Sequence, residues 1–229
     1  MSELLEIGDR IVALARPGEQ VEVVVGRATS TEVRAYDGQV EQFASATSAG
    51  VGVRVIAGNR QGFAYAGTLD ADVMAETLAE ARDNATFATD DEWLGLAEPD
   101  GLAVPALDLY RESLTRVSTD AKIDLALELE RAVRAADPRI TGVESADYAD
   151  GVSEGAVVST TGIRTYGRET SCYVAAHCVA TDGDDTQTGF GFSVGRTLDD
   201  LDVSVAAGDA ARRATRLLGA TKPASGRVT

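Results

Sequence analysis

The most reactive side chains in this sequence are Cys172, His177 and Cys178, which lie close together along the chain. Thiolate and imidazole groups are common zinc ligands, and a Cys/His pair can also act as a nucleophile and its base. The surrounding residues alternate as in a β-strand, which rises about 3.3 Å per residue. Cys172 and Cys178 would then stand about 20 Å apart, too far to share a metal ion or form a disulfide. The spacing favours two buried thiols and one outward imidazole.

Hydrolytic machinery is also poorly supported. The chain has a single histidine, whereas zinc hydrolases usually hold the metal with three protein ligands, commonly two of them His. No HExxH-like pair occurs, and no G-x-S-x-G sequence accompanies His177, which would have to serve as the base of a serine triad. The sequence therefore predicts no catalytic, cofactor-binding or metal-binding residues in this chain. An enzymatic role centred on His177 is the weakest alternative.

Two further motifs have simpler structural explanations. Asp182-Gly183-Asp184-Asp185 resembles the start of a calcium loop, but Ser193 stands where such a loop places its bidentate Glu. We interpret the segment as a hairpin turn. The Gly50-x-Gly52 sequence lies inside a strand pattern and no helix follows it, so it is not a dinucleotide-binding fingerprint. Close backbone approach or a bulge explains these glycines better.

Composition limits the classes of partner. The chain has 229 residues, is 44% hydrophobic and carries a formal net charge of −16, with a pI near 4.4. A nucleic-acid backbone would be repelled by this charge, so no direct nucleic-acid partner is expected. The start of the sequence lacks the features of a signal peptide, and no apolar run is long enough to span a bilayer. We expect a soluble cytoplasmic protein with no membrane partner.

The first part of the chain changes from a helical to a strand period. Apolar residues at helical spacing predict a helix from about Leu4 to Leu14, which Pro17-Gly18 ends. Alternating residues then predict short strands, with Asp37-Gly38 as a tight hairpin turn. Asp70 is the expected N-cap of the next helix. The predicted strands are 21–25, 32–36, 39–44, 51–55 and 61–66.

The second part repeats this order after a weakly patterned linker at 86–117, in which we expect a short helix around 107–114. Ser118 is predicted to cap a helix that ends at Asp137-Pro138. A final helix is expected over about 198–218. The predicted strands are 140–148, 155–159, 163–170, 172–181 and 188–194. The residues expected on solvated helix faces are Glu128, Glu130, Arg131, Arg212 and Arg213.

The two parts resemble each other in sequence. Residues 47–57 correspond to 170–180, and Gly62-Phe63-Ala64-Tyr65-Ala66 corresponds to Gly189-Phe190-Gly191-Phe192-Ser193. Such a long-period duplication predicts an α+β fold built from two helix–antiparallel meander–helix units. We divide the chain into 1–117 (first unit plus linker), 118–220 (second unit) and 221–229 (connector to a missing C-terminal domain). Whether the two meanders form one sheet is left open.

Residues 31–84 contain a DG hairpin, a G-V-G-V-R-V strand, a G-F-A-Y strand and a helix ending in A-x-x-N-A. The order and spacing of these motifs resemble the TldD/PmbA family. Residues 137–141 and 211–214 continue the resemblance, which covers essentially the whole chain. Residues 192–201 are similar to the F/Y-x-x-G-R-x-x-x-D-L run of PmbA-type members, and this run supports a zinc-free PmbA/TldE-type assignment.

The resemblance implies a cytoplasmic zinc metallopeptidase complex that degrades unfolded peptides and matures some ribosomally made peptides. In the family, a TldD-type subunit holds zinc with an HExxxH motif in its C-terminal domain, and a PmbA-type subunit lacks this motif. N-terminal domains such as this one help to form the subunit interface and an enclosed chamber. The expected partners are therefore a TldD-type zinc subunit and extended peptide, with no cofactor in this chain.

Two hypotheses follow. In the first, the chain is the N-terminal domain of a PmbA/TldE-type subunit and supplies scaffold and substrate enclosure. In the second, it is a stand-alone peptide- or protein-binding module without a link to proteolysis, in which an exposed strand edge binds an extended segment. The coding sequence beyond Thr229 would discriminate between them. A continuing domain without an HExxxH motif would support the first hypothesis, a stop codon would support the second, and an HExxxH motif would indicate the catalytic TldD-type subunit instead.

Overall fold

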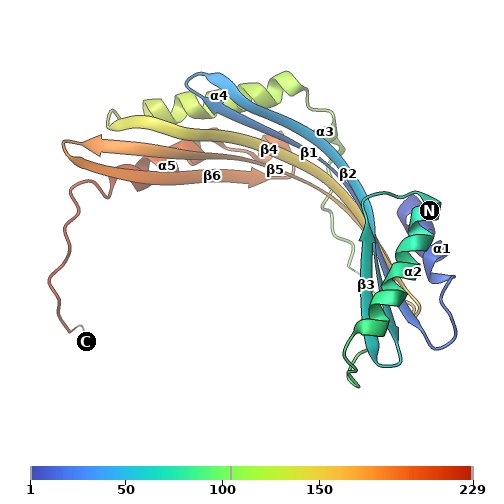
Figure 1. Cartoon of the computed structure of the whole chain (residues 1–229). Coiled ribbons are helices and arrows are strands. Elements are labelled where there is room, and N and C mark those ends of the chain that lie inside the picture. The colour runs from blue at the N-terminus through green and yellow to red at the C-terminus, as the bar shows by residue number, and fades with distance from the viewer. Residues whose placement is uncertain (1, 104, 228–229) are drawn as a thin grey trace. The chain divides into compact units, whose positions relative to one another are not determined.

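The computed structural model describes residues 2–103 and 105–227 and shows an α+β fold (Figure 1). Its strands form one six-stranded sheet in the order β3-β2-β1-β4-β5-β6. The two meanders therefore share a sheet, joined where β1 lies beside β4. The strands are β1 (Gln20–Tyr36), β2 (Gln39–Ala57), β3 (Arg60–Ala66), β4 (Ile140–Ser159), β5 (Arg164–Asp182) and β6 (Asp185–Gly195). The helices are α1 (Glu3–Val12), α2 (Ala71–Phe87), α3 (Glu112–Thr115), α4 (Thr119–Ala136), the 3-10 turn η1 (Leu198–Asp200) and α5 (Val203–Thr215).

The described residues pack as two compact units that interleave along the chain. Unit 1 comprises 1–29, 46–110 and 152–169, and unit 2 comprises 30–45, 111–151 and 170–229. Strands β1, β2, β4 and β5 contribute residues to both units. The division of the sequence into 1–117, 118–220 and 221–229 describes contiguous segments, whereas each unit combines several segments. That division stays a prediction.

Unit 1 has its core between α1, α2 and one face of its strands. Alternate residues of β1 and β2 point to these helices, as a strand period of two requires, and Val23, Val53 and Val55 are fully buried. Leu4 of α1 and Leu78 of α2 pack into the same apolar cluster. One face of the unit 1 strands is thereby covered by helices.

Unit 2 is built in the same way from α4, α5 and its own strand residues. Leu129 and Val133 of α4 belong to a cluster that also contains Val174 of β5. Helix α5 contributes small residues to that cluster, including Ala206 and Ala210. Because these alanines keep α5 close to the sheet, its packing depends on backbone proximity more than on large side chains.

Several sequence predictions are confirmed locally. Ser118 precedes α4, and its side chain accepts a hydrogen bond from the Ala121 amide. Asp37 and Gly38 both have positive φ angles, 51° and 74°, in the tight turn between β1 and β2. Asp182 pairs with Asp185 across the β5–β6 hairpin, so this acidic segment is a turn.

The predicted strand and helix boundaries need correction. Short expected strands merge into longer ones, as in β1, which continues through residues 26–31. A neighbouring strand on each side supplies backbone partners there, which overrides weak local propensity. The helix expected at 107–114 is reduced to α3. The helix expected at 198–218 divides into η1 and α5, because the Asp202 side chain accepts from the Val205 amide and starts a new helix.

Glycines at equivalent positions of the duplication let a helix backbone touch each edge strand. A Cβ added to Gly62 would lie 1.9 Å from the Ala81 carbonyl oxygen of α2, and one added to Gly189 would lie 2.0 Å from the Ala210 carbonyl oxygen of α5. Neither backbone oxygen can move without shifting its helix. The same close contact in both units supports the duplication that the sequence predicts.

Gly62→Ala and Gly189→Ala are expected to lower the free energy of unfolding by about 2–3 kcal/mol each, because the new methyl group must displace a helix backbone. Urea unfolding followed by circular dichroism measures this change. Gly67→Ala is the matched control, since no atom lies within 4 Å of its added Cβ. Equal stability of Gly62→Ala and Gly67→Ala would show that the helix adjusts freely.

Glu130 of α4 was expected on a solvated face, and that prediction is wrong. Its side chain is 1% exposed. It accepts hydrogen bonds from the Gly38 amide at 2.9 Å and from Arg134 at 2.8 Å. Burial raises the pKa of Glu130, but these donors outweigh burial and lower it overall. The carboxylate thus holds the β1–β2 turn against α4.

Glu130→Gln is expected to lower the free energy of unfolding by about 1–2 kcal/mol at neutral pH, because the charge-assisted bond to Arg134 is lost. Since the folded pKa is lowered, the contribution of Glu130 is present above its unfolded pKa of about 4.3 and is lost as pH falls through the folded value. The difference from wild type should therefore shrink on acidification. Glu128→Gln, at an exposed position on the same helix, is the control, and a pH-independent difference would contradict this account.

Candidate binding surfaces

The cysteines and the histidine lie on opposite faces of β5, as the strand period predicts. Cys172 and Cys178 are buried with free thiols in unit 2, while His177 is exposed. The Cys172 thiol donates to the Thr197 carbonyl oxygen at 3.2 Å. The His177 ring lies 4.5 Å from the Phe190 ring, measured between centroids. The three side chains therefore form no common site.

The environment of the thiols opposes nucleophilic chemistry. Burial, with a contribution from the nearby carboxylates of Asp150 and Asp200, raises the pKa of Cys172 to about 11. Burial also raises the pKa of Cys178. Since the thiolate is the reactive and metal-binding form, both cysteines are held in their inert state near neutral pH. Among residues 2–103 and 105–227, no group of three or more His, Cys, Asp or Glu side chains is arranged to hold a metal ion.

An open face of unit 2 carries a cluster of aromatic and apolar side chains, which we name the unit 2 patch. Its members are Tyr173, His177, Phe190, Phe192 and Val194, and they line a shallow hollow of about 480 Å³. Phe192 is 47% exposed and Val194 is 62% exposed. The Phe190 and Phe192 rings stack with centroids 5.6 Å apart. This surface can accept apolar groups or cations over its ring faces.

Charged groups adjoin the unit 2 patch. Arg34 of β1 donates to the Asp147 carboxylate of β4 at 2.8 Å, and Asp147 also lines the hollow. The hydrogen bond and charge of Asp147 raise the pKa of Arg34, with smaller contributions from Glu41 and Glu144. The pKa of Tyr173 is raised by burial first and then by the charges of Asp147 and Glu32.

Unit 1 has a corresponding open surface, the unit 1 patch, over β2 and β3. Its members are Val24, Gly50, Gly52, Phe63 and Tyr65, within a hollow of about 720 Å³. The Phe63 ring lies 3.3 Å from where a Cβ of Gly52 would stand, so it covers the bare backbone of that glycine. Cross-strand cover of a glycine by an aromatic ring stabilises a strand. Tyr65 is 76% exposed.

The two patches occupy equivalent positions of the duplication. In unit 1, Gly52 pairs with Tyr65 across β2 and β3. In unit 2, Ala175 pairs with Phe192 across β5 and β6. Arg54 and Phe63 correspond in the same way to His177 and Phe190. In the sequence, the signal for both patches is a pair of aromatic residues at alternate positions, Phe63 and Tyr65 in β3 and Phe190 and Phe192 in β6. Their exposure could not be inferred from the sequence, because the alternation does not show which face of the strand the helices cover.

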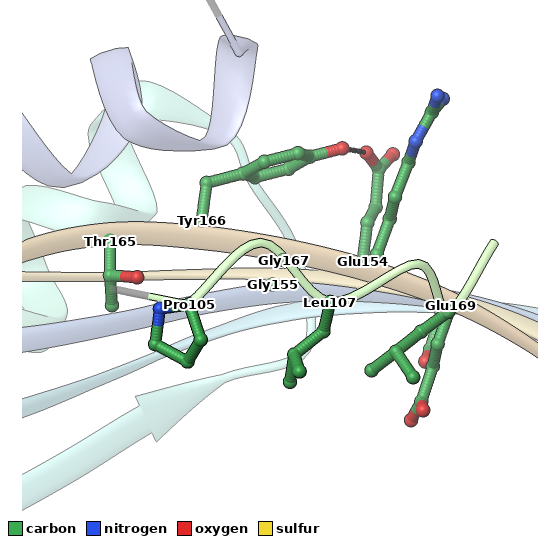
Figure 2. A pocket seen from close by; sticks show the side chains of 11 residues that line it. Pro105, Leu107, Glu154, Gly155, Thr165, Tyr166, Gly167 and Glu169 are labelled. Carbon is green, nitrogen blue, oxygen red and sulfur yellow. Dashed lines mark hydrogen bonds between the residues drawn. The ribbon is translucent and has the colours of Figure 1, made fainter. Parts of the chain in front are cut away.

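A separate hollow of about 480 Å³ in unit 1 lies between residues 105–109 and strands β4 and β5. Figure 2 shows the Tyr166 hydroxyl directed at the Glu154 carboxylate, to which it donates at 2.5 Å. Glu154 also pairs with Arg27. The hydrogen bond from Tyr166 lowers the pKa of Glu154, burial opposes this, and Arg27 lowers it further. These polar groups pair with each other, which is typical of a structural role.

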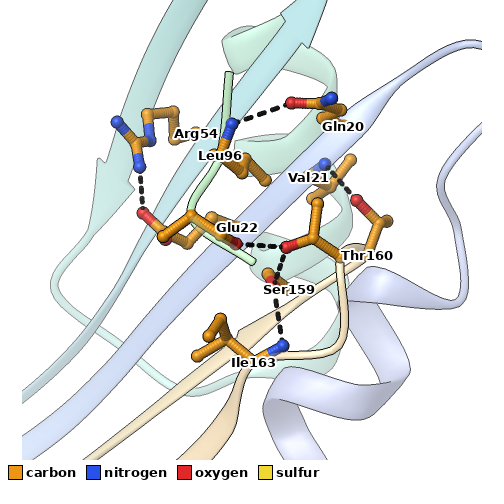
Figure 3. A network of polar contacts seen from close by, with 10 residues as sticks. Gln20, Val21, Glu22, Arg54, Leu96, Ser159, Thr160 and Ile163 are labelled. Carbon is orange, nitrogen blue, oxygen red and sulfur yellow. Dashed lines mark hydrogen bonds and ion pairs between the residues drawn. The ribbon is translucent and has the colours of Figure 1, made fainter. Parts of the chain in front are cut away.

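A polar network fixes the linker after α2 to the start of β1 (Figure 3). The Leu96 amide donates to the Gln20 side chain at 2.9 Å, and the Val21 amide donates to the Thr160 hydroxyl at 3.0 Å. Arg54 donates to Glu22 at 2.6 Å on the neighbouring strand. All of these residues belong to unit 1. Within the linker, Leu96 and Ala97 are the residues held, because the Thr161 hydroxyl also donates to the Ala97 carbonyl oxygen at 2.7 Å.

A buried ionic cluster in unit 2 was not foreseen from the sequence. Lys122 of α4 lies 2.6 Å from the Asp150 carboxylate and donates to the Thr31 hydroxyl at 3.0 Å. The Tyr148 hydroxyl donates to Asp150 at 2.6 Å, and burial followed by this carboxylate raises the pKa of Tyr148. Buried charges require such partners. The cluster is complete in itself and joins α4 to β1 and β4.

Helix side chains protect the edge strands. Asn84 of α2 donates to the Phe63 carbonyl oxygen of β3 at 3.0 Å. Arg213 of α5 donates to the Phe190 carbonyl oxygen of β6 at 2.8 Å. These acceptors are equivalent in the duplication. Because β3 and β6 are the outer strands of the sheet, both bonds occupy an edge carbonyl that an added strand could otherwise use.

Family profiles match two segments of the chain. The profile described as PmbA/TldA metallopeptidase central domain matches residues 112–218. The profile described as PmbA/TldA metallopeptidase domain 1 matches residues 21–85. The two matches follow each other along the sequence in the order of their domain numbers.

Curated relatives carry the same family name. The metalloprotease PmbA of Escherichia coli O157:H7 is 29% identical over 202 residues, which cover 84% of this chain and 43% of that protein. A metalloprotease PmbA homologue of Haemophilus influenzae is 26% identical over 152 residues, which cover 66% of this chain and 32% of that protein. The chain thus spans less than half the length of these relatives.

Solved structures share the fold. A candidate modulator of DNA gyrase from Thermotoga maritima has a TM-score of 0.82 and 22% identity, covering 96% of this chain and 50% of its own. TldE from Thermococcus kodakarensis has a TM-score of 0.75 and 19% identity, covering 91% and 46%. A candidate modulator of DNA gyrase from Bacteroides thetaiotaomicron has a TM-score of 0.81 and 20% identity, covering 97% and 51%.

Both thiols are expected to resist modification in the folded chain. At about pH 8, reaction with Ellman's reagent should be at least about a hundredfold slower than for free cysteine, because burial raises both thiol pKa values. Denaturant should expose both thiols to full reaction. A thiol that reacts rapidly in the native chain would revive the nucleophile hypothesis, and Cys172→Ser and Cys178→Ser would identify it.

Proposed function

We propose, since this chain belongs to the PmbA/TldD metallopeptidase family, that it is the N-terminal part of a PmbA/TldE-type subunit. In this proposal it works with a zinc-bearing TldD-type subunit in a cytoplasmic complex that cleaves unfolded or precursor peptides. The chain supplies scaffold and substrate enclosure, and the partner supplies catalysis. The consecutive match of two family domains carries the proposal.

The zinc that the family name implies does not fit the groups of this chain. Its single histidine points away from both cysteines. The cysteines are buried, and their pKa values are raised, which disfavours the thiolate that a metal requires. The proposal assigns the zinc ligands to the partner subunit.

The PmbA/TldE-type assignment draws on two observations. Curated relatives named PmbA match the chain, and residues 195–201 follow the pattern of PmbA-type members. Similarity to TldE from Thermococcus kodakarensis supports the shared fold.

None of the helices in the described residues is long and apolar enough to cross a membrane.

Enclosure of peptide is supported by the open sheet surfaces. Both patches present exposed aromatic side chains over strands whose other face is already covered by helices. Exposed apolar surface of this kind commonly marks an interaction site. Extended peptide can lie over such a surface through side-chain contacts, without adding to the protected strand edges.

A stand-alone binding module is the alternative, and the same exposed patches favour it. Strand addition within residues 51–55 of β2 is unsuitable as its mechanism, because β2 lies between β1 and β3. Strand addition would require β3 or β6, where Asn84 and Arg213 already occupy edge carbonyls. Both hypotheses predict peptide binding, so assembly with a TldD-type subunit is the measurement that discriminates between them.

Co-expression with an HExxxH-bearing TldD-type protein should give a complex that co-purifies through size-exclusion chromatography and hydrolyses an unfolded peptide. The chain or its full-length parent alone should show no hydrolysis. A partner variant with Gln in place of the HExxxH glutamate is the control, and it should assemble without activity. A chain that stays a monodisperse monomer beside several such partners would count against the complex and favour the binding module.

A further inference from the structure

We propose that the unit 2 patch binds a basic segment of extended polypeptide, with Lys or Arg side chains placed over its rings and beside its carboxylates. The inference deepens the proposed function, on which it rests for identifying that segment as substrate. Binding itself is a property of this chain. The reasons lie in the exposed aromatic side chains, the charge beside them and the contrast with the unit 1 patch.

The apolar part of the surface is accessible. Phe192 and Val194 are 47% and 62% exposed, and they border a hollow of about 480 Å³. The Phe190 ring stacks on Phe192, which presents a continuous aromatic surface. The aliphatic stems of Lys and Arg can pack on such rings while their charged heads remain hydrated. A cation over an aromatic face adds an electrostatic attraction.

The charge beside the rings selects a cation. Glu32, Arg34, Asp147 and Tyr173 line a hollow that adjoins the unit 2 patch, and Glu41 and Glu144 also act on Arg34 through their charges. Four carboxylates and one guanidinium give this group of residues a formal surplus of three negative charges. Arg34 pairs with Asp147 at 2.8 Å, and Glu32, Glu41 and Glu144 are exposed to solvent. A basic segment would neutralise them at distances where screening by salt is incomplete.

The unit 1 patch shows that this charge is specific to unit 2. Beside the Phe63 ring, Glu22 pairs with Arg54, which lies opposite Phe63 across β2 and β3. Glu154 pairs with Arg27, which also contacts Glu3 of α1. The duplication thus supplies two aromatic surfaces in the same strand register, of which the unit 1 surface pairs both Glu22 and Glu154 with an arginine, whereas the unit 2 surface has Arg34 beside several carboxylates.

Other occupants are disfavoured by the same charges. Nucleic acid would bring phosphates to an acidic surface. A second copy of the chain would bring its own net charge of −16 and the same carboxylates. An acidic peptide would be repelled in the same way. A basic polypeptide is the macromolecule that complements both the rings and the charge.

The test uses fluorescence anisotropy of the whole chain with a labelled peptide of about 12 residues in which Lys alternates with Ser, long enough to cross several strands. Saturable binding is expected, and it should weaken as salt is raised from about 50 mM to about 300 mM. The same peptide with Glu in place of Lys should not bind. Equal binding of the Lys and Glu peptides would overturn the proposal.

Two variants locate the site. Phe192→Ala should weaken binding of the Lys peptide by about fivefold to tenfold, through loss of the ring face. A double variant, Glu32→Gln with Glu41→Gln, should weaken it by about tenfold and flatten its salt dependence, while leaving the Arg34–Asp147 pair intact. Tyr65→Ala is the comparison variant in unit 1, at the register position of Phe192, and it should weaken binding less than Phe192→Ala does. Phe87→Ala is the neutral control, since its ring is 88% exposed and lies outside both patches; its affinity should stay within about twofold of wild type.

All substituted side chains are exposed, so each variant should keep the unfolding midpoint of the wild type, which is measured in parallel. If Tyr65→Ala weakens binding as much as Phe192→Ala, the assignment to unit 2 is overturned. Self-association that Phe192→Ala abolishes would assign the patch to a second copy instead. Failure of peptide binding together with successful assembly with a TldD-type subunit would remove this inference and leave the proposed function standing.

Discussion

Close backbone contact between each edge strand and its helix is the constraint on which the rest of the structure depends. Gly62 and Gly189 let α2 and α5 approach until only a hydrogen atom fits between strand and helix. The small residues of α5, such as Ala210, follow from the same closeness. With the helices held so near, Asn84 and Arg213 reach the carbonyl oxygens of the edge strands. One packing requirement thus fixes the helices and also protects the edges.

Fixing the helices on one face leaves the opposite face open over β2 and β3 in unit 1 and over β5 and β6 in unit 2. Along β5, Cys172, Val174 and Cys178 point to the helices and are buried, whereas Tyr173 and His177 point away. The strand period therefore separates the reactive residues that the sequence places together. It also gathers the aromatic residues that the sequence places apart, on β5 and β6, into one surface.

The sequence predicted the features that local chemistry determines. The positive φ angles at Asp37 and Gly38 and the cap at Ser118 depend on a few adjacent residues, and both are confirmed. Strand lengths were underestimated, because pairing on both sides of β1 outweighs the weak propensity of residues 26–31. Burial of Glu130 and the pairing of Lys122 with Asp150 depend on partners distant in sequence. Such contacts cannot be inferred from helical periodicity, which marks charged residues as solvated.

The candidate surface was harder to predict than the fold, for a physical reason. In a strand that buries one face, the aromatic residues stand at alternate positions. The alternation does not show whether the helices cover the face with these residues or the opposite face. The answer comes from Gly62 and Gly189, whose bare backbones identify the helix-facing phase and leave Phe63 and Phe190, one residue later, on the open side. Duplication then keeps the register in both units. The units differ in the residues at equivalent positions, such as Arg54 and His177, and in the charges at the rim of each patch. Substitutions at such exposed positions cost little stability and can alter the choice of ligand.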